Sequence, residues 1–206
     1  MDSAVQVLEI TQKKLPQAEV EAYALREKSL NIKVFEGKVD AFNLADYQGV
    51  GLRVILEGRC GTAYTEKLDS DSLNEVVDRA IEGGDIAPAD PCRRIESPET
   101  LFSLGQESVK NETGSQKVGK KVDMALELEQ TSRDYDRRII NVPYASCFEG
   151  FREVRLANSH GLDCSYARGG AGLAVQVMAR EGEEVKSPYK VQYTLHSKDL
   201  DSKGLA

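Results

Sequence analysis

The same order of elements, a helix followed by strands that glycines interrupt, occurs twice along the chain. Apolar residues at helical spacing predict helices over 3–14 and 117–134. After each helix, alternating apolar residues predict strands, with turns at Gly37 and Gly161. Such an order favours an α+β fold with antiparallel meander sheets and helices packed on one face. It is also compatible with two related halves.

The strands expected from alternation are short. A third helix is expected over 73–81, after a capping box made by Ser72 and Glu75. The expected strands are 19–26, 30–35, 39–44, 52–56 and 61–65 in the first half, and 138–147, 151–157, 162–168, 172–180 and 189–195 in the second.

A long connection divides the chain. Residues 85–116 are polar and contain three prolines, and loops of this length often border functional sites. They join a first half, 1–84, to a second half, 117–206, and together these form one amino-terminal domain. A polar run before residue 73 caps a helix, whereas the matching run before residue 200 lies close to Ala206. We therefore expect the natural polypeptide to continue past residue 206.

Composition excludes several function classes. The net charge is −7 and the 27 Lys and Arg residues are scattered, so direct nucleic-acid binding is not expected. No apolar run reaches the roughly 18 residues of a membrane span, and Met1 to Ser3 do not begin a signal peptide. The four cysteines form no C-x-x-C pair and suggest reduced thiols. These features predict a cytoplasmic protein.

No complete catalytic site is visible in the sequence. The two histidines, His160 and His196, have no H-E-x-x-H spacing, and no G-x-S-x-G motif is present. Cys147 and Cys164 fall in expected strands, which favours buried and inert thiols. We therefore expect no catalytic residue, no metal ligand and no cofactor in this chain, which should be inactive alone.

The glycine clusters are not expected to bind phosphate. Gly49 and Gly51, like the glycines at 169–172, precede strands, whereas a dinucleotide loop opens a helix. A turn or bulge is the favoured interpretation. Arg53 is the one charged residue within the first glycine-rich strand pattern, and exposure to water is favoured over pairing with a carboxylate.

Several segments together resemble the amino-terminal domain of the TldD/PmbA family, also known as modulators of DNA gyrase or peptide-maturation proteins. The resemblance begins at the A-E-V-E-A-Y segment, 18–23, and covers essentially the whole chain. The G-V-G-L-R and G-x-A-Y-T segments are fairly specific as a set, and the first favours the PmbA branch. The matching positions, which we expect to be structural, are Gly37, Gly49, Gly51, Arg53, Gly58, Gly61, Tyr64, Thr65, Asn158, Ser159 and Gly161.

This resemblance implies a function for a longer parent protein. TldD-type members carry an H-E-x-x-x-H zinc motif in their carboxy-terminal half and act as metallopeptidases on unfolded peptides, whereas PmbA-type members are inactive partners. The resemblance therefore implies a non-catalytic domain that helps to bind unfolded peptides and to assemble a homodimer or heterodimer. Zinc is implied for the active full-length relatives. The alternative is a protein-interaction module, or a regulator linked to DNA gyrase, with no proteolytic role.

A sheet-rich domain offers a physical route to this function. Strand addition satisfies the backbone groups of an extended peptide without requiring one side-chain sequence. It therefore suits substrates that are defined by being unfolded. The connection over 83–116 is expected to border the binding groove.

Overall fold

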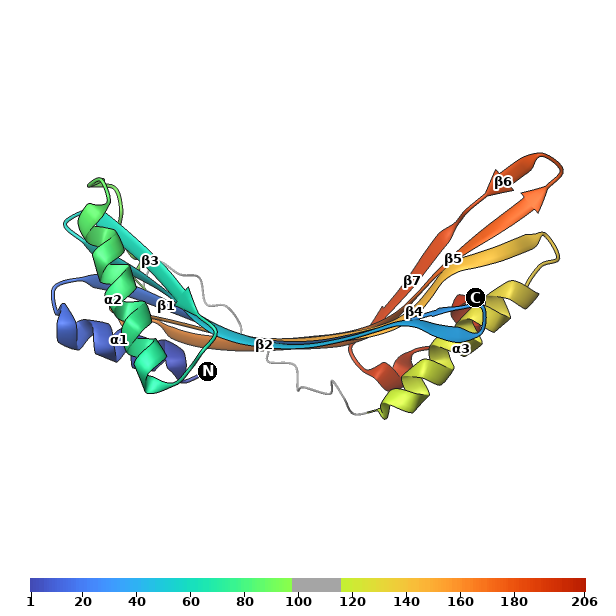
Figure 1. Cartoon of the computed structure of the whole chain (residues 1–206), viewed down its shortest axis with the longest axis horizontal. Helices are drawn as coiled ribbons and strands as arrows, with labels where there is room; N and C mark the ends of the chain where they lie inside the picture. The colour runs from blue at the N-terminus through green and yellow to red at the C-terminus, as the bar shows by residue number, and fades with distance from the viewer. Residues whose placement is uncertain (98–115) are drawn as a thin grey trace. The chain divides into compact units, whose positions relative to one another are not determined.

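The computed structural model describes residues 1–97 and 116–206, and it confirms the predicted α+β fold (Figure 1). The helices are α1 (Ser3–Lys14), α2 (Ser70–Ile86), α3 (Val118–Asp134) and α4 (Ser202–Leu205), with a 3₁₀ turn η2 (Ser197–Asp199). The strands are β1 (Glu19–Phe35), β2 (Lys38–Leu56), β3 (Arg59–Thr65), β4 (Ile139–Asn158), β5 (Asp163–Glu181), β6 (Glu184–Lys186) and β7 (Tyr189–Thr194).

The seven strands form one antiparallel sheet in the order β3-β2-β1-β4-β5-β6, and β7 also pairs with β5. Strands β1 to β3 are a meander, as the sequence predicts. The turns between them lie at 36–37 and 57–58, where all four residues have positive φ. This conformation is that of a tight hairpin turn, and a glycine is the second residue of each.

Four of the strands are longer than predicted, because each combines two expected strands. The predicted breaks within β1 and β4 fall near Lys28 and Phe148, where polar side chains interrupt the apolar alternation. In β1, residues 25–29 include no buried side chain, and cross-strand ion pairs take the place of apolar burial there, with Arg152 and Glu27 at 2.7 Å and Lys28 and Asp46 at 2.9 Å. Such pairs support a strand that has little apolar surface to bury.

The chain divides into two compact units that the long strands share. Of the described residues, the first unit contains 1–27, 47–97 and 152–167. The second unit contains 28–46, 116–151 and 168–206. Each unit has its own apolar core.

In the first unit, α1 and α2 cover one face of the sheet. Alternate residues of β1 and β2, such as Val20 and Leu52, pack against Val7 of α1 and against Val77 of α2. The cap of α2 differs from the predicted Ser72–Glu75 box. Asp69 is the N-cap, and its carboxylate accepts hydrogen bonds from the backbone N–H and the hydroxyl of Ser72. Asp69 displaces the box because it stands one residue before the first helical position.

In the second unit, α3 covers one face of the sheet. Ile32 and Val34 of β1 pack with Leu128 of α3 and Leu173 of β5. The carboxylate of the buried Glu129 accepts hydrogen bonds from the backbone N–H groups of Glu36 (2.7 Å) and Gly37 (2.9 Å), so α3 also fixes the β1–β2 turn.

The expected connection begins later than predicted, because α2 continues through two glycines to Ile86. Residues 98–115, most of that connection, lie outside the described residues, and so does the expected groove border there. No helix of the described ranges is long and apolar enough to cross a membrane.

Candidate functional site

Side chains that could bind a metal are dispersed. Across residues 1–97 and 116–206, no three His, Cys, Asp or Glu side chains converge as a metal site would require. His160 lies in the turn between β4 and β5, and His196 lies at the start of η2. The described residues therefore do not fit the zinc that the family resemblance implies for active relatives.

The turn at Asn158, in the first unit, is held by several hydrogen bonds. The buried Asn158 side chain accepts hydrogen bonds from the backbone N–H groups of His160 and Leu162, both at 3.0 Å, and donates to the carbonyl of Glu96. Ser159 binds Val20 twice, by its N–H at 2.8 Å and its hydroxyl at 3.0 Å. Gly161 completes the turn with a φ of +88°. These contacts tie the turn to the start of β1.

Glu19 connects the same turn to the segment after α2. Its carboxylate accepts a hydrogen bond from the backbone N–H of Ile95 at 2.8 Å and lies 3.0 Å from Nε2 of His160. The Ile95 hydrogen bond, followed by the contact with His160, holds the pKa of Glu19 below its ordinary value. A carboxylate bound in this way stays ionised and positions the chain near Ile95.

Arg53 pairs with a carboxylate, contrary to the prediction that it points to water. Its guanidinium lies 3.0 Å from the carboxylate of Glu21 in the neighbouring strand β1. The two residues stand on the sheet face opposite to the helices, where alternation also places Tyr64. The pairing was not visible in the sequence because 32 positions separate the partners.

Gly49 and Gly51 lie within the continuous strand β2, so the turn that was one interpretation of them is wrong. The same holds for Gly170 and Gly172 of β5. None of these four has positive φ. Close approach explains Gly49 instead, since a Cβ there would lie 3.1 Å from the carbonyl oxygen of Thr65.

Gly58 and Gly61 each allow another backbone segment to approach closely. A Cβ on Gly61 would lie 1.8 Å from the carbonyl oxygen of Ala80 in α2. A Cβ on Gly58 would lie 2.7 Å from the carbonyl oxygen of Asp90, whose N–H donates to the Gly58 carbonyl. Thr65, at the end of β3, exchanges hydrogen bonds with Lys67. Gly61 thus lets β3 approach α2, and Gly58 lets the β2–β3 turn approach residue 90.

The cysteines are all free, but they differ in exposure. Cys147 is buried, as predicted, and burial raises the pKa of its thiol to about 11. Cys164 is exposed, contrary to the prediction, because it lies near the start of β5, where both faces of the strand are solvent-accessible. A neutral thiol at Cys147 is not a nucleophile.

Strand β7 of the second unit is an edge strand. Among the described strands it pairs with β5 alone, with Val175 opposite Lys190 and Leu173 opposite Gln192. The register continues to Val177, whose N–H donates to the carbonyl of Pro188. Because hydrogen-bonded pairs alternate in antiparallel ladders, β7 directs alternate backbone groups away from β5. The residues with outward backbone groups are Tyr189, Val191 and Tyr193.

Aromatic rings line the face of the sheet that carries the side chains of Tyr189, Val191 and Tyr193. Phe148 and Tyr193 meet edge to face with ring centroids 5.3 Å apart, and Tyr144 and Tyr189 are 6.4 Å apart. Tyr193 is 76% exposed. Partial burial, then the neighbouring tyrosines, raise the pKa of Tyr189. Such exposed rings beside a free strand edge are suited to contact with another chain.

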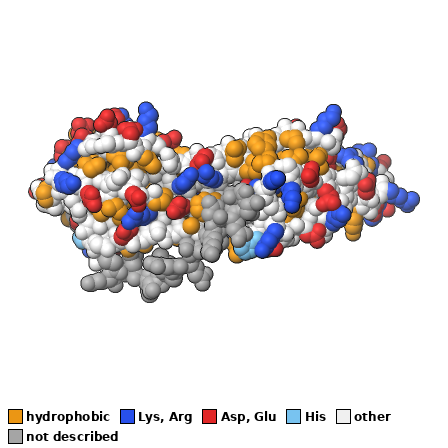
Figure 2. Space-filling view, turned by 90° about the horizontal axis from the view of Figure 1, so that it is seen from below, with side chains coloured by type: hydrophobic (Ala, Val, Ile, Leu, Met, Phe, Trp, Pro, Cys, Tyr) orange, Lys and Arg blue, Asp and Glu red, His pale blue; other side chains and the backbone are white. Residues whose placement is uncertain are grey.

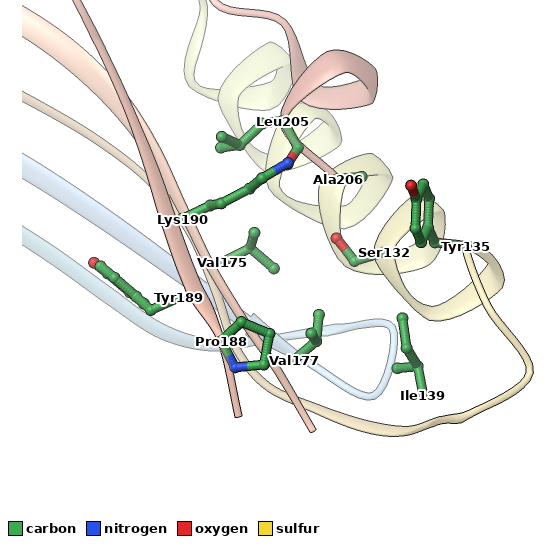
Figure 3. A pocket seen from close by; sticks show the side chains of 10 residues that line it. All are labelled: Ser132, Tyr135, Ile139, Val175, Val177, Pro188, Tyr189, Lys190, Leu205 and Ala206. Carbon is green, nitrogen blue, oxygen red and sulfur yellow. The ribbon is translucent and has the colours of Figure 1, made fainter. Parts of the chain in front are cut away.

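An apolar cavity of about 200 Å³ lies on the other face of β7. Figure 3 shows Val175 and Val177 pointing from the sheet towards α3, and Ser132 pointing from α3 towards them. Lys190 reaches from β7 to the carbonyl oxygen of Leu205 at 3.2 Å and bounds one side. The edge strand β7 therefore borders a partly open apolar cavity.

Charge is mixed on the face that Figure 2 draws. On the face drawn in Figure 2, acidic and basic side chains are interspersed, and hydrophobic side chains gather between them.

Comparison with known proteins identifies two domain types. Residues 20–83 match the family model of the PmbA/TldA metallopeptidase domain 1, and residues 111–205 match that of the PmbA/TldA metallopeptidase central domain. The chain is 23% identical over 185 residues to the metalloprotease PmbA homolog of Haemophilus influenzae. That match covers 89% of this chain and 40% of the relative.

Solved structures with low sequence identity share the fold. A candidate DNA gyrase modulator from Thermotoga maritima matches with a TM-score of 0.83 at 18% identity, over 99% of this chain and 45% of that one. TldE from Thermococcus kodakarensis matches with a TM-score of 0.84 at 16% identity, over 98% and 45%. A candidate DNA gyrase modulator from Bacteroides thetaiotaomicron matches with 0.81 at 22% identity, over 99% and 47%. The chain thus spans less than half the length of these proteins.

Proposed function

Because the chain belongs to the PmbA/TldD metallopeptidase family and contains its first and central domains, we propose that it is the non-catalytic, peptide-binding part of a family metallopeptidase or of its inactive partner. Zinc chemistry, where the parent protein has it, is supplied by residues outside this chain. The part described here binds unfolded peptide and helps to assemble the dimer.

The edge of β7 carries this proposal. Outward N–H and carbonyl groups of Tyr189, Val191 and Tyr193 match the hydrogen-bonding pattern of an extended peptide, which adds as a further strand. Backbone pairing recognises unfolded chains without regard to sequence. The exposed rings at 189 and 193 add contact area on one face of the added strand.

Replacing Val191 by proline tests the edge directly. Proline removes the outward N–H of residue 191 and leaves intact the inward hydrogen bonds of residues 190 and 192 to β5. We expect the Kd of the 206-residue chain for a labelled, carboxymethylated unfolded polypeptide to rise about tenfold, since one hydrogen bond and the alignment of its neighbours are lost. Fluorescence anisotropy measures this change.

Val191→Ala is the matched control, because it shortens the same side chain and keeps the N–H. Its Kd should stay within about threefold of wild type. Circular dichroism and thermal unfolding establish that both variants are folded. Equal affinities of Val191→Pro and Val191→Ala for the unfolded polypeptide would refute binding at this edge.

Assembly with a second family member is the other part of the proposal. Phe42 and Leu44 of β2 are exposed by 47% and 72%. They are two positions apart and so lie on the same face of the strand, and neighbouring exposed apolar side chains favour protein contacts. Sedimentation velocity should find the wild-type chain dimeric, alone or with a family partner, and Leu44→Glu more dissociated.

Four free cysteines support a reducing, cytoplasmic setting.

A second candidate function is a protein-interaction module linked to DNA gyrase, without a role in proteolysis. The descriptions of the Thermotoga and Bacteroides structures favour it. The net charge of −7 favours action through protein partners rather than DNA. Capture of gyrase subunits by the chain, together with absent affinity for unfolded polypeptide, would favour this candidate over peptide binding.

A further inference from the structure

The cavity beside β7 contains one polar atom that lacks a partner. Ser132 of α3 lines the cavity and is 1% exposed. Its hydroxyl has no hydrogen-bond partner within the part of the chain that the structure describes. Leaving a buried hydroxyl unpaired is costly, so a group that enters the cavity and hydrogen-bonds to Ser132 gains affinity. Ile139, Val175 and Val177 contribute apolar side chains to the wall.

The volume of the cavity decides the size of its occupant. An engineered apolar cavity of about 150 Å³ holds benzene, whereas sites for drug-sized ligands measure about 300–1,000 Å³. At about 200 Å³, this cavity is suited to a single aromatic ring with a small substituent. An apolar ring that carries one hydroxyl satisfies both the walls and Ser132.

The position of the cavity connects it to the edge strand. Pro188, just before β7, and Lys190 of β7 line it, and the side chain of Lys190 points to the helix-covered face of the sheet. A strand added to β7 would lie about 5 Å away, with alternate side chains on that same face. Val175 and Val177 of β5 are one strand spacing further away, about 10 Å from the added strand, so an aromatic side chain would reach over β7 to the near side of the cavity, at Pro188 and Lys190.

We propose that the cavity is a side-chain subsite for the peptide bound at β7, and that it selects tyrosine over phenylalanine through Ser132. This inference rests on the proposed peptide-binding function and adds a preference to it. Strand addition supplies sequence-independent affinity, and the subsite supplies selection at one position of the peptide.

Small-molecule analogues of the two side chains test the subsite without any peptide. In NMR titrations of the 206-residue chain, p-cresol should shift the methyl resonances of Ile139, Val175, Val177 and Leu205. Toluene, which lacks the hydroxyl, should bind at the same methyls about fivefold more weakly, as expected for the loss of one hydrogen bond. No shift of these methyls with either compound would overturn the proposal.

Two variants separate the hydroxyl from the cavity. In Ser132→Ala, toluene should still bind, and the preference for p-cresol should fall to about one. In Val177→Phe the added ring fills the space, so both compounds should lose binding while the aromatic cluster of Tyr193 keeps its resonances. An unchanged p-cresol preference in Ser132→Ala would overturn the assigned role of Ser132.

Peptide measurements distinguish failure of the subsite from failure of strand addition. Extended peptides that differ only by Tyr, Phe or Ala at one position should bind in the order Tyr, Phe, Ala, and Val191→Pro should weaken all three. Equal affinity for the three peptides with a persistent Val191→Pro effect would refute the subsite alone. Binding of p-cresol at the cavity with no Val191→Pro effect on any peptide would refute strand addition, and with it the peptide subsite.

Discussion

The two units hold a helix against the sheet in different ways. In the first unit, α2 approaches β3 so closely that Gly61 has no room for a side chain. In the second unit, α3 extends the Glu129 carboxylate to the N–H groups of the β1–β2 turn. Packing of α2 in the first unit therefore depends on the missing side chain of Gly61, and packing of α3 in the second unit depends on the buried carboxylate of Glu129.

The two hairpin turns have the same two residues, but the contacts that hold them differ between the units. Both are Glu-Gly pairs with positive φ, at 36–37 and 57–58. The second turn is held by the backbone of Asp90, whereas the first is held by the side chain of Glu129. The same local sequence thus forms the same turn, and tertiary contacts decide what secures it.

Buried charge is concentrated in the second unit. Of the described residues, the buried charged side chains are Lys121, Glu129 and Glu149, all in that unit. Lys121 and Glu149 lie 2.5 Å apart and compensate each other, and Arg133 partners Glu129 at 2.9 Å. Such pairs fix geometry more than they add stability. The proposed binding edge and the cavity belong to this same unit.

The largest expected effect tests the close approach in the first unit. Gly61→Ala places a Cβ against the backbone of α2, so the helix must shift, and the free energy of unfolding should fall by more than about 3 kcal/mol. Gly51→Ala is the control, because its Cβ would meet neighbours only at 3.9 Å or more. Urea denaturation measures both variants, and equal losses would contradict the steric explanation.

The next effect tests the buried carboxylate of the second unit. Glu129→Ala leaves the N–H groups of Glu36 and Gly37 without their acceptor, and should cost about 3 kcal/mol in urea denaturation. The exposed Glu75→Ala, which removes a surface pair with Arg79 in α2, should cost about 0.5 kcal/mol. A loss for Glu129→Ala no larger than for Glu75→Ala would show that the turn secures itself.

The smallest effect concerns alkaline pH. Burial raises the pKa of Cys147 from 9.0 to about 11, so the folded state keeps a proton that the unfolded state releases. The stabilisation is fully present below pH 9 and is lost as pH rises towards 11, by at most about 2.7 kcal/mol. Cys147→Ala should flatten this loss, whereas Cys164→Ala should not. Parallel declines in all three proteins would contradict a buried neutral thiol.

Sequence reasoning predicted elements whose signals are local. The first helix, expected over 3–14, forms as Ser3–Lys14, because apolar spacing and a following proline at 16 define it within one window. The turns at Gly37 and Gly161 are likewise local, since a positive φ favours glycine. The α+β class follows from the same patterns.

Features that depend on distant residues were not predictable. The long strands continue where Arg152 pairs with Glu27, a partner 125 positions away. The Arg53–Glu21 pair, the Glu129 contact and the cavity beside β7 also require segments that only the fold brings together. The edge position of β7 follows from sheet order, which alternation along a single strand does not encode.

The most direct test of peptide binding by the second unit is residue-resolved amide hydrogen exchange with and without unfolded polypeptide. Strand addition at β7 predicts that the outward amides of Tyr189, Val191 and Tyr193 exchange more slowly when peptide is bound. The inward amides of Lys190 and Gln192, already bonded to β5, should change little. Protection that is absent from the three outward amides while peptide is bound would contradict strand addition at β7.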